Sequence, residues 1–201
     1  MRALIMAGGE GSRLDLGEKP LVTVGGIPMI RRIIDAFVEA GHEPVVVVSP
    51  RTPMTRNWCR VQGIPVYPAG GMGYVEDLVE AVTDLEEAGP VFTCTSDLPC
   101  LTSDLIRVIE AAYCSAGTPA LSVWVPRDLS PGEESSGGYQ EVVEGVPAFP
   151  AGINIVRGSG ITAPQEETPL LLHSRRLAFH VNTREELARV QDWMRTKRHQ
   201  H

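Results

Sequence analysis

The sequence predicts a single α/β domain, a three-layer α/β/α sandwich in which helices cover both faces of a mainly parallel, twisted sheet. Short apolar runs alternate with longer stretches of helical periodicity from the first residues almost to the last. Most runs are continuously apolar, which is typical of parallel strands buried on both faces. The chain has 201 residues, of which 43% are hydrophobic and 21% charged, so it can bury one sizeable core and is not globally disordered.

The expected strands and helices follow in chain order. Strands are expected at residues 3–6, 44–48, 64–67, 91–95, 120–125, 153–156 and 177–181, with one antiparallel strand in the C-terminal half. Helices are expected from Pro28 to Gly41, from Tyr74 to Ala88, from Thr102 to Ala116 and from Thr183 onward. Thr183 followed by Glu186 is a capping box, which favours a helix start at that point.

An irregular segment interrupts this rhythm at residues 127–145, which are rich in glycine and proline and poor in apolar side chains. We expect an excursion from the sheet around residues 127–150 within the single domain 1–201. A long loop of this kind is either a lid or substrate-binding element, or a plain mobile insertion.

The charge, the cysteines and the N-terminus narrow the class of protein. Lys and Arg number 18 against 25 Asp and Glu, a net charge of -7, which argues against binding long nucleic acid through bulk charge. The four cysteines lack zinc-site spacing and are expected to be reduced thiols. The apolar stretch within residues 1–7 is too short for a signal peptide or a membrane span, so we expect a cytoplasmic protein.

A glycine cluster directly after the first expected strand is the strongest chemical signal. Gly8, Gly9 and Gly11 fall within four positions, and their backbone amides can turn toward phosphate oxygens because no Cβ blocks the approach. Two cations lie in the same region. The guanidinium of Arg13 can bind two phosphate oxygens at once, and the ammonium of Lys19 is a compact point charge. The alternative is a tight turn with two surface cations, but the position after an apolar strand favours a phosphate cradle.

Asp97 follows the expected strand at residues 91–95, at the edge of the sheet where α/β domains bind ligands. A carboxylate beside a triphosphate can hold Mg²⁺, which binds one or two carboxylates together with phosphate oxygens and water. The alternative is that Asp97 only caps the turn before Pro99.

These two motifs carry a family resemblance. The pattern G-G-x-G-x-R-L at residues 8–14, followed by K-P-L at residues 19–21, resembles nucleotidyltransferases of the Rossmann-like glycosyltransferase-A type, with the nucleotide-diphospho-sugar transferase fold. The resemblance implies that a nucleoside triphosphate is held by Gly8, Gly9, Gly11, Ser12, Arg13 and Lys19. It also implies that Arg13, Lys19 and Asp97 act in catalysis, with Asp97 binding Mg²⁺.

Residues 71–78, 149–156 and 180–187, together with the opening motif, resemble archaeal GTP-dependent adenosylcobinamide-phosphate guanylyltransferases. This implies GTP and a phosphorylated corrinoid as substrates, and it is the only source for the choice of guanine. It implies further that Gly73, Tyr74 and Asn182 contact the nucleotide, while Gly152 and Asn154 lie on the acceptor side, as does the excursion.

Several of these residues have simpler interpretations. Gly152 can be a strand bulge, Asn182 part of the turn before Thr183, and Tyr74 only the start of a helix. The alternative functions are a guanylyltransferase acting on the molybdenum cofactor or another small acceptor, and a nucleotide-binding regulator without catalysis. The oligomeric state stays open, with a homodimer among the alternatives.

The glycine segment also departs from the family pattern, because Glu10, Asp15 and Glu18 bring negative charge close to the expected triphosphate. We expect this charge to weaken nucleotide binding or to increase its dependence on Mg²⁺.

Overall fold

The computed structural model describes residues 1–9, 11, 14–130 and 140–198. An eight-stranded sheet runs in the order β10-β7-β9-β6-β1-β4-β5, and β8 pairs with β9 beside this path. The strands are β1 (Arg2–Met6), β4 (Glu43–Val48), β5 (Val66–Pro68), β6 (Pro90–Thr95), β7 (Ala120–Pro126), β8 (Glu141–Val143), β9 (Val146–Arg157) and β10 (Glu167–Leu171). β1 is parallel to both of its neighbours, β4 and β6, whereas β9 is antiparallel to β6, β7 and β8.

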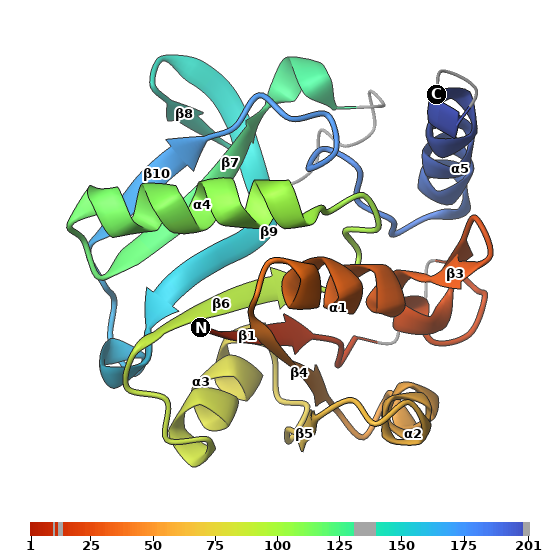
Figure 1. The fold of residues 1–201 in the computed structure, drawn as a ribbon, viewed down its shortest axis with the longest axis horizontal. Helices are drawn as coiled ribbons and strands as arrows, with labels where there is room; N and C mark the ends of the chain where they lie inside the picture. The colour runs from red at the N-terminus through yellow and green to blue at the C-terminus, as the bar shows by residue number, and fades with distance from the viewer. Residues whose placement is uncertain (10, 12–13, 131–139, 199–201) are drawn as a thin grey trace.

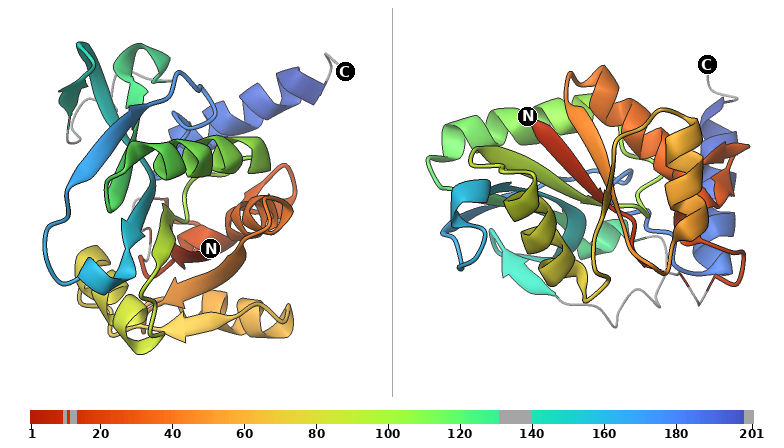
Figure 2. Two further views of the ribbon diagram at one scale, coloured as in Figure 1. Left: turned by 60° about the vertical axis from the view of Figure 1, so that its left-hand side comes forward. Right: turned by 90° about the horizontal axis from the view of Figure 1, so that it is seen from below.

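Helices cover both faces of this sheet. They are α1 (Met29–Glu39), α2 (Pro53–Val61), α3 (Tyr74–Asp84), α4 (Ser103–Ala116) and α5 (Arg184–Arg198). The apolar sides of α1, α2 and α4 pack on one face, while α3 packs on the other (Figures 1 and 2). The expected three-layer arrangement around a mainly parallel sheet is therefore confirmed.

α5 lies beside the sheet, next to a short hairpin formed by β2 (Thr23–Val24) and β3 (Ile27–Pro28) (Figure 1). Phe179, Val181 and Val190 pack there against Leu14 and Val24 in a separate apolar cluster. This packing brings the chain just before α5 next to the segment that follows β1, although the two segments lie near opposite ends of the sequence.

Several expected elements are confirmed. The helix that was expected from Pro28 begins at Met29, directly after Pro28. In the predicted capping box, the Glu186 carboxylate accepts from the Thr183 amide at 3.0 Å and the Thr183 hydroxyl accepts from the Glu186 amide at 3.2 Å. The expected antiparallel strand is β9, which is longer than predicted and includes residues 146–150 of the expected excursion. The other residues of that excursion include 131–139, which lie outside the described residues.

The prediction of a strand at residues 177–181 is wrong. Leu177 and Ala178 donate backbone hydrogen bonds to Ser174 and Arg175 in turns and pack in the main core, while Phe179 and Val181 pack in the cluster beside α5. The apolar character of this run reflects burial and not strand pairing.

Two elements, β10 and α2, were not predicted from the sequence. β10 carries Pro169 and polar residues at the edge of the sheet, and α2 buries only Thr55 and Cys59. Among the described helices, none combines the length and apolar character needed to cross a membrane.

Candidate active site

A pocket of about 290 Å³ opens at the carboxyl ends of β1, β4, β5 and β6. This is the edge at which open α/β sheets bind ligands, because loops diverge there. Six residues predicted from sequence line it: Gly8, Gly9, Lys19, Gly73, Tyr74 and Asp97. The fold therefore brings the glycine segment and the predicted metal-binding carboxylate together.

Lys19 is the cation that connects the pocket. It opens a 3₁₀ turn, and its Nζ donates to Asp97 Oδ2 at 3.0 Å and to Asn182 Oδ1 at 2.8 Å. The side chains of Lys19 and Asp97 are only 15% and 9% exposed, so water screens this ion pair much less than a surface pair. Three predicted residues from distant parts of the chain thus form one hydrogen-bonded group.

Asp97 is held from its other side as well. The Thr95 hydroxyl donates to Asp97 Oδ1 at 2.6 Å, and Nδ1 of His180 lies 3.8 Å from the same oxygen. Burial alone would raise the pKa of Asp97, but His180, Lys19 and the hydrogen bonds from Thr95 and Lys19 outweigh it and lower the pKa to about 2. The carboxylate is therefore ionised at neutral pH.

Gly8, Gly9 and Gly11 each occupy their positions for a different structural reason. A Cβ on Gly8 would lie 3.1 Å from Cβ of Ser49, and the Ser49 hydroxyl donates to the Gly8 carbonyl at 2.7 Å. Gly11 has φ +67°, and a Cβ there would lie 2.5 Å from Cβ of Lys19. Gly9 faces open space, with no atom near its Cβ position. Gly11 thus gives room to Lys19, whereas Gly9 leaves the pocket open.

The segment between β5 and α3 forms the opposite wall. The buried carboxylate of Asp77 accepts from the backbone amides of Gly71 and Met72 at 2.9 and 3.0 Å, which fixes this wall. Tyr74 is 42% exposed as a residue, while its hydroxyl is hydrogen-bonded to the Thr93 side chain, and burial raises the pKa of Tyr74. Tyr74 therefore lines the pocket as a partly exposed residue whose hydroxyl is held in place.

Gly152 and Asn154 lie within β9 and do not line the pocket. Gly152 has φ +74° and sits behind Thr95, whose hydroxyl reaches the Gly152 carbonyl at 3.3 Å. The Oδ1 atom of Asn154 accepts from the Val123 amide at 3.1 Å, where the register between β7 and β9 shifts. The bulge interpretation of Gly152 thus matches the strand geometry.

Comparison with known proteins decides the family. The MobA-like NTP transferase domain family matches residues 3–201, which is nearly the whole chain. The chain belongs to the MobA-like NTP transferase family.

Relatives of this MobA-like NTP transferase extend the comparison. It is 32% identical to the adenosylcobinamide-phosphate guanylyltransferase of Methanocaldococcus jannaschii over 93% of this chain and 94% of the relative. It is 34% identical to the 2-aminoethylphosphonate cytidylyltransferase of Lancefieldella rimae over 57% of this chain and 50% of the relative.

Solved structures with low sequence identity show the same fold. CMP:2-keto-3-deoxy-manno-octonic acid synthetase, solved in complex with CTP, matches with a TM-score of 0.74 at 14% identity over 98% of this chain and 100% of that one. A hypothetical transferase from Thermus thermophilus matches with a TM-score of 0.68 at 17% identity over 92% and 98%. The expected nucleotidyltransferase fold is confirmed, and the MobA-like NTP transferase is an enzyme of this class.

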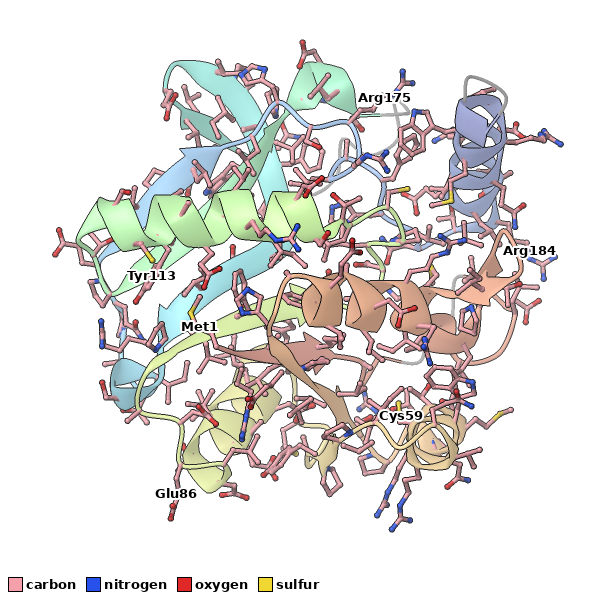
Figure 3. All side chains as sticks on the ribbon, in the orientation of Figure 1. Met1, Cys59, Glu86, Tyr113, Arg175 and Arg184 are labelled. Carbon is pink, nitrogen blue, oxygen red and sulfur yellow. The ribbon has the colours of Figure 1, made fainter. Side chains whose placement is uncertain are left out.

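Two acidic residues near the glycine segment, Glu18 and Asp15, make their side-chain contacts outside the pocket. Glu18 does not line the pocket, because its carboxylate accepts from the Met54 and Thr55 amides at 2.7 and 2.6 Å at the start of α2. Asp15 pairs with Arg184, which reaches from the start of α5 to the segment after β1 (Figure 3). Both carboxylates are thus engaged away from the pocket. Glu10, Ser12 and Arg13 lie outside the described residues.

Four further residues of this MobA-like NTP transferase were not identified from the sequence: Arg51, Asp77, Thr95 and His180. Arg51, Asp77 and Thr95 line the pocket, and His180 lies behind it against Asp97. Thr95 and His180 each stand two positions before a predicted residue, Asp97 and Asn182, and both side chains lie beside Asp97 Oδ1. That spacing was the available signal.

Proposed function

We propose that this enzyme transfers GMP from GTP to adenosylcobinamide phosphate, giving adenosylcobinamide-GDP and pyrophosphate in the assembly of the cobalamin nucleotide loop. The observation that carries the proposal is the similarity to the Methanocaldococcus jannaschii enzyme over 93% and 94% of the two chains. The pocket supports it, because glycine amides and Lys19 stand where a triphosphate needs donors.

In this proposal, Gly8, Gly9 and Gly11 with Ser12, Arg13 and Lys19 hold the triphosphate. An oxygen of the acceptor phosphate attacks the α phosphorus in line, and the bond from that phosphorus to the oxygen of the β phosphate breaks. The electron pair leaves with pyrophosphate. The attacking oxygen is already anionic, so the reaction needs alignment and charge neutralisation more than a strong base.

The nucleoside end of GTP is proposed to lie along the wall formed by Gly73 and Tyr74. The partly exposed Tyr74, held at its hydroxyl by Thr93, suits stacking on a base or contact with the ribose. Asn182 is proposed to act on the nucleotide through Lys19, to which its side-chain oxygen is hydrogen-bonded at 2.8 Å.

The chemistry of the pocket fits Mg²⁺. Asp97 is ionised, and a second carboxylate, Asp77, lines the same pocket. The described residues contain no cluster of three or more His, Cys, Asp or Glu side chains arranged around a metal, and Mg²⁺ commonly takes one or two carboxylates plus phosphate oxygens and water. Held by Asp97 and the phosphates, Mg²⁺ would neutralise charge that develops on the leaving pyrophosphate.

The acceptor is proposed to approach from the β9 side, where Gly152 and Asn154 lie. Thr95 and the Gly152 carbonyl are on the Oδ1 side of Asp97, whereas Lys19 is on the Oδ2 side. Asp97 would thus stand between the nucleotide and the acceptor. We also propose a cytoplasmic location, and light scattering on the purified protein would decide between a monomer and a homodimer.

The test is a substrate matrix with the full-length protein. GTP, CTP, ATP or UTP is offered with Mg²⁺ and with adenosylcobinamide phosphate or molybdopterin, and pyrophosphate release is measured. We expect release only with GTP and the corrinoid, and only a small residual rate from Asp97→Asn, which keeps the shape of the side chain but removes its charge. Release with molybdopterin would favour the molybdenum cofactor alternative, and nucleotide binding without turnover would favour a regulator.

A further inference from the structure

The Oδ1 oxygen of Asp97 has its own set of contacts, separate from the Lys19 side. It accepts the Thr95 hydroxyl at 2.6 Å and lies 3.8 Å from Nδ1 of His180, while Lys19 is bound to Oδ2 at 3.0 Å. The His180 segment is also connected through the backbone, because the Val181 amide donates to the Asp97 carbonyl at 3.1 Å. Asp97 is therefore held at both oxygens and at its own backbone.

The surroundings of the His180 ring determine which nitrogen carries its proton. Nε2 is buried and has no hydrogen-bond partner within the described part of the chain, and the ring meets Phe149 edge to face at 6.2 Å. A buried N–H without an acceptor costs more than an unprotonated nitrogen in the same place. In the neutral ring the proton therefore resides on Nδ1, which faces Asp97.

Gly152 makes the room for this arrangement. A Cβ at Gly152 would lie 2.6 Å from the Thr95 hydroxyl and 3.3 Å from Cε1 of His180. Both of the side chains that contact Asp97 Oδ1 would be displaced. The glycine thus contributes through the space it leaves, and its backbone carbonyl lies 3.3 Å from the Thr95 hydroxyl, whose one proton is donated mainly to Asp97 Oδ1 at 2.6 Å.

We infer that His180 is a positioning residue of the transferase, which together with Thr95 and the space at Gly152 fixes the Asp97 carboxylate so that Oδ2 faces Lys19 and the nucleotide pocket. The inference rests on the proposed function for its kinetic readout. It assigns His180 no contact with substrate, because Nε2 is buried. Loss of the ring nitrogen that lies 3.8 Å from Asp97 Oδ1 is expected to act on kcat and to leave the KM for GTP nearly unchanged.

A pair of amide substitutions separates the two ring nitrogens. The amide nitrogen of asparagine can occupy the place of Nδ1, whereas that of glutamine reaches the place of Nε2. We expect His180→Asn to retain most of the wild-type kcat and His180→Gln to lower kcat by about 10- to 100-fold, the range found when a group that orients a catalytic ligand is removed. Equal losses in the two variants, at equal thermal stability, would overturn the inference.

A double-mutant cycle tests whether His180 acts through Asp97. If it does, His180→Gln causes little further loss of residual turnover in an Asp97→Asn background, because the carboxylate that it orients is already gone. Losses that multiply independently would show that His180 acts elsewhere and would overturn the inference.

Nitrogen-15 NMR of the ring provides a readout that needs no acceptor. We expect the neutral His180 ring to carry its proton on Nδ1 in the wild-type protein. A ring protonated on Nε2 in an active enzyme would overturn the inference without touching the proposed function. Conversely, an Nδ1-protonated ring in a protein that fails to turn over GTP with the corrinoid would overturn the proposed function and support the geometry inferred for His180.

Discussion

The two halves of the sheet use their residues differently. In the parallel half, from β6 through β1 to β5, the predicted residues lie in loops beyond the strands, and Gly8, Lys19 and Asp97 meet at one pocket. In the mixed half, Gly152 and Asn154 lie inside β9, where Asn154 accepts from the Val123 amide of the sheet and Gly152 lies against the Thr95 hydroxyl. The halves join where β9 runs antiparallel to β6, which brings Gly152 beside Thr95. The pocket residues thus lie beyond the ends of the parallel strands, and the antiparallel strand β9 supports them through the contact of Gly152 with Thr95.

The largest effect is expected for the parallel half. Lys19→Ala removes the cation between Asp97 and Asn182, and we expect kcat/KM to fall by about 10²- to 10³-fold, or roughly 3–4 kcal/mol in the barrier, as for the loss of one donor to a developing anion. Steady-state kinetics with GTP and the corrinoid measure this. Arg107→Ala, which removes a cation from α4 outside the pocket, is the control and should leave kcat/KM unchanged. Unchanged kinetics in Lys19→Ala would remove Lys19 from the mechanism.

The mixed half is tested by a pair of glycines with the same backbone conformation. Gly152 and Gly145 have φ of +74° and +80°, but a Cβ would strike Thr95 only at Gly152 and would meet nothing at Gly145. We expect Gly145→Ala to cost about 1 kcal/mol of unfolding free energy through the backbone, and Gly152→Ala up to about 3 kcal/mol. Urea denaturation measures both.

The kinetics of the same pair separate shape from stability. Gly152→Ala should lower kcat, because Thr95 and His180 move away from Asp97, whereas Gly145→Ala should not. Equal effects of the two substitutions on stability and on kcat would mean that the close approach to Thr95 has no role, and the contrast between the halves would fail.

The two halves also differ in how much of them was predictable. Continuous apolar runs located β1, β4, β6 and β7, and glycine and charge patterns pointed to the pocket residues Gly8, Gly9, Lys19 and Asp97. The glycine pattern did not reveal that Gly11 serves the approach of Lys19, because that contact depends on the path of the chain between them. Local composition thus predicts which segment holds the hydrogen-bond donors. Which side chain packs against each glycine depends on the fold.

In the mixed half the same rules fail for a physical reason. The run at residues 177–181 is as apolar as a strand, but its side chains are buried partly in the main core and partly under α5. The amides of Leu177 and Ala178 pair in turns, and the Val181 amide pairs with the Asp97 carbonyl. β10 is an edge strand with Pro169 and polar side chains, so it carries little apolar signal. The hydrogen bond from the Val123 amide to Asn154 exists only because the register shifts between β7 and β9. Hydrophobic periodicity reports burial and contains no information on register.

The unfolding free energy at low pH tests the charge of Asp97, which lies where the two halves of the sheet meet. The pKa of Asp97 is about 2 in the folded protein against an ordinary value of 3.8, so the ionised carboxylate stabilises the fold by about 2 kcal/mol above pH 4. Because the folded pKa is the lower one, this contribution is lost as the pH falls from about 4 to about 2. We expect the difference in unfolding free energy between the wild type and Asp97→Asn to shrink across that range. Asp15→Asn, at an exposed carboxylate, is the control, and a difference between wild type and Asp97→Asn that does not change with pH would contradict the burial and pairing of Asp97.

The smallest effect is expected for Glu18, which belongs to the parallel half in sequence but faces away from its pocket. Its carboxylate accepts the Met54 and Thr55 amides and the Thr55 hydroxyl at the start of α2, so it acts as a helix cap. We expect Glu18→Ala to lower the unfolding free energy by about 1 kcal/mol and to leave the KM for GTP unchanged. Asp15→Asn, in the same segment but at the surface, should change neither quantity.

This last pair decides between two interpretations of the acidic residues near the glycine segment. If Glu18 repelled the triphosphate, its removal would lower the KM for GTP, most strongly at low ionic strength where charges at a distance are least screened. A cap acts on stability at any ionic strength and has no effect on nucleotide affinity, because its hydrogen bonds are made within the chain. A drop in KM together with unchanged stability would therefore show that Glu18 acts through the nucleotide pocket, and would remove the distinction between residues that face the pocket and residues that only lie near it in sequence.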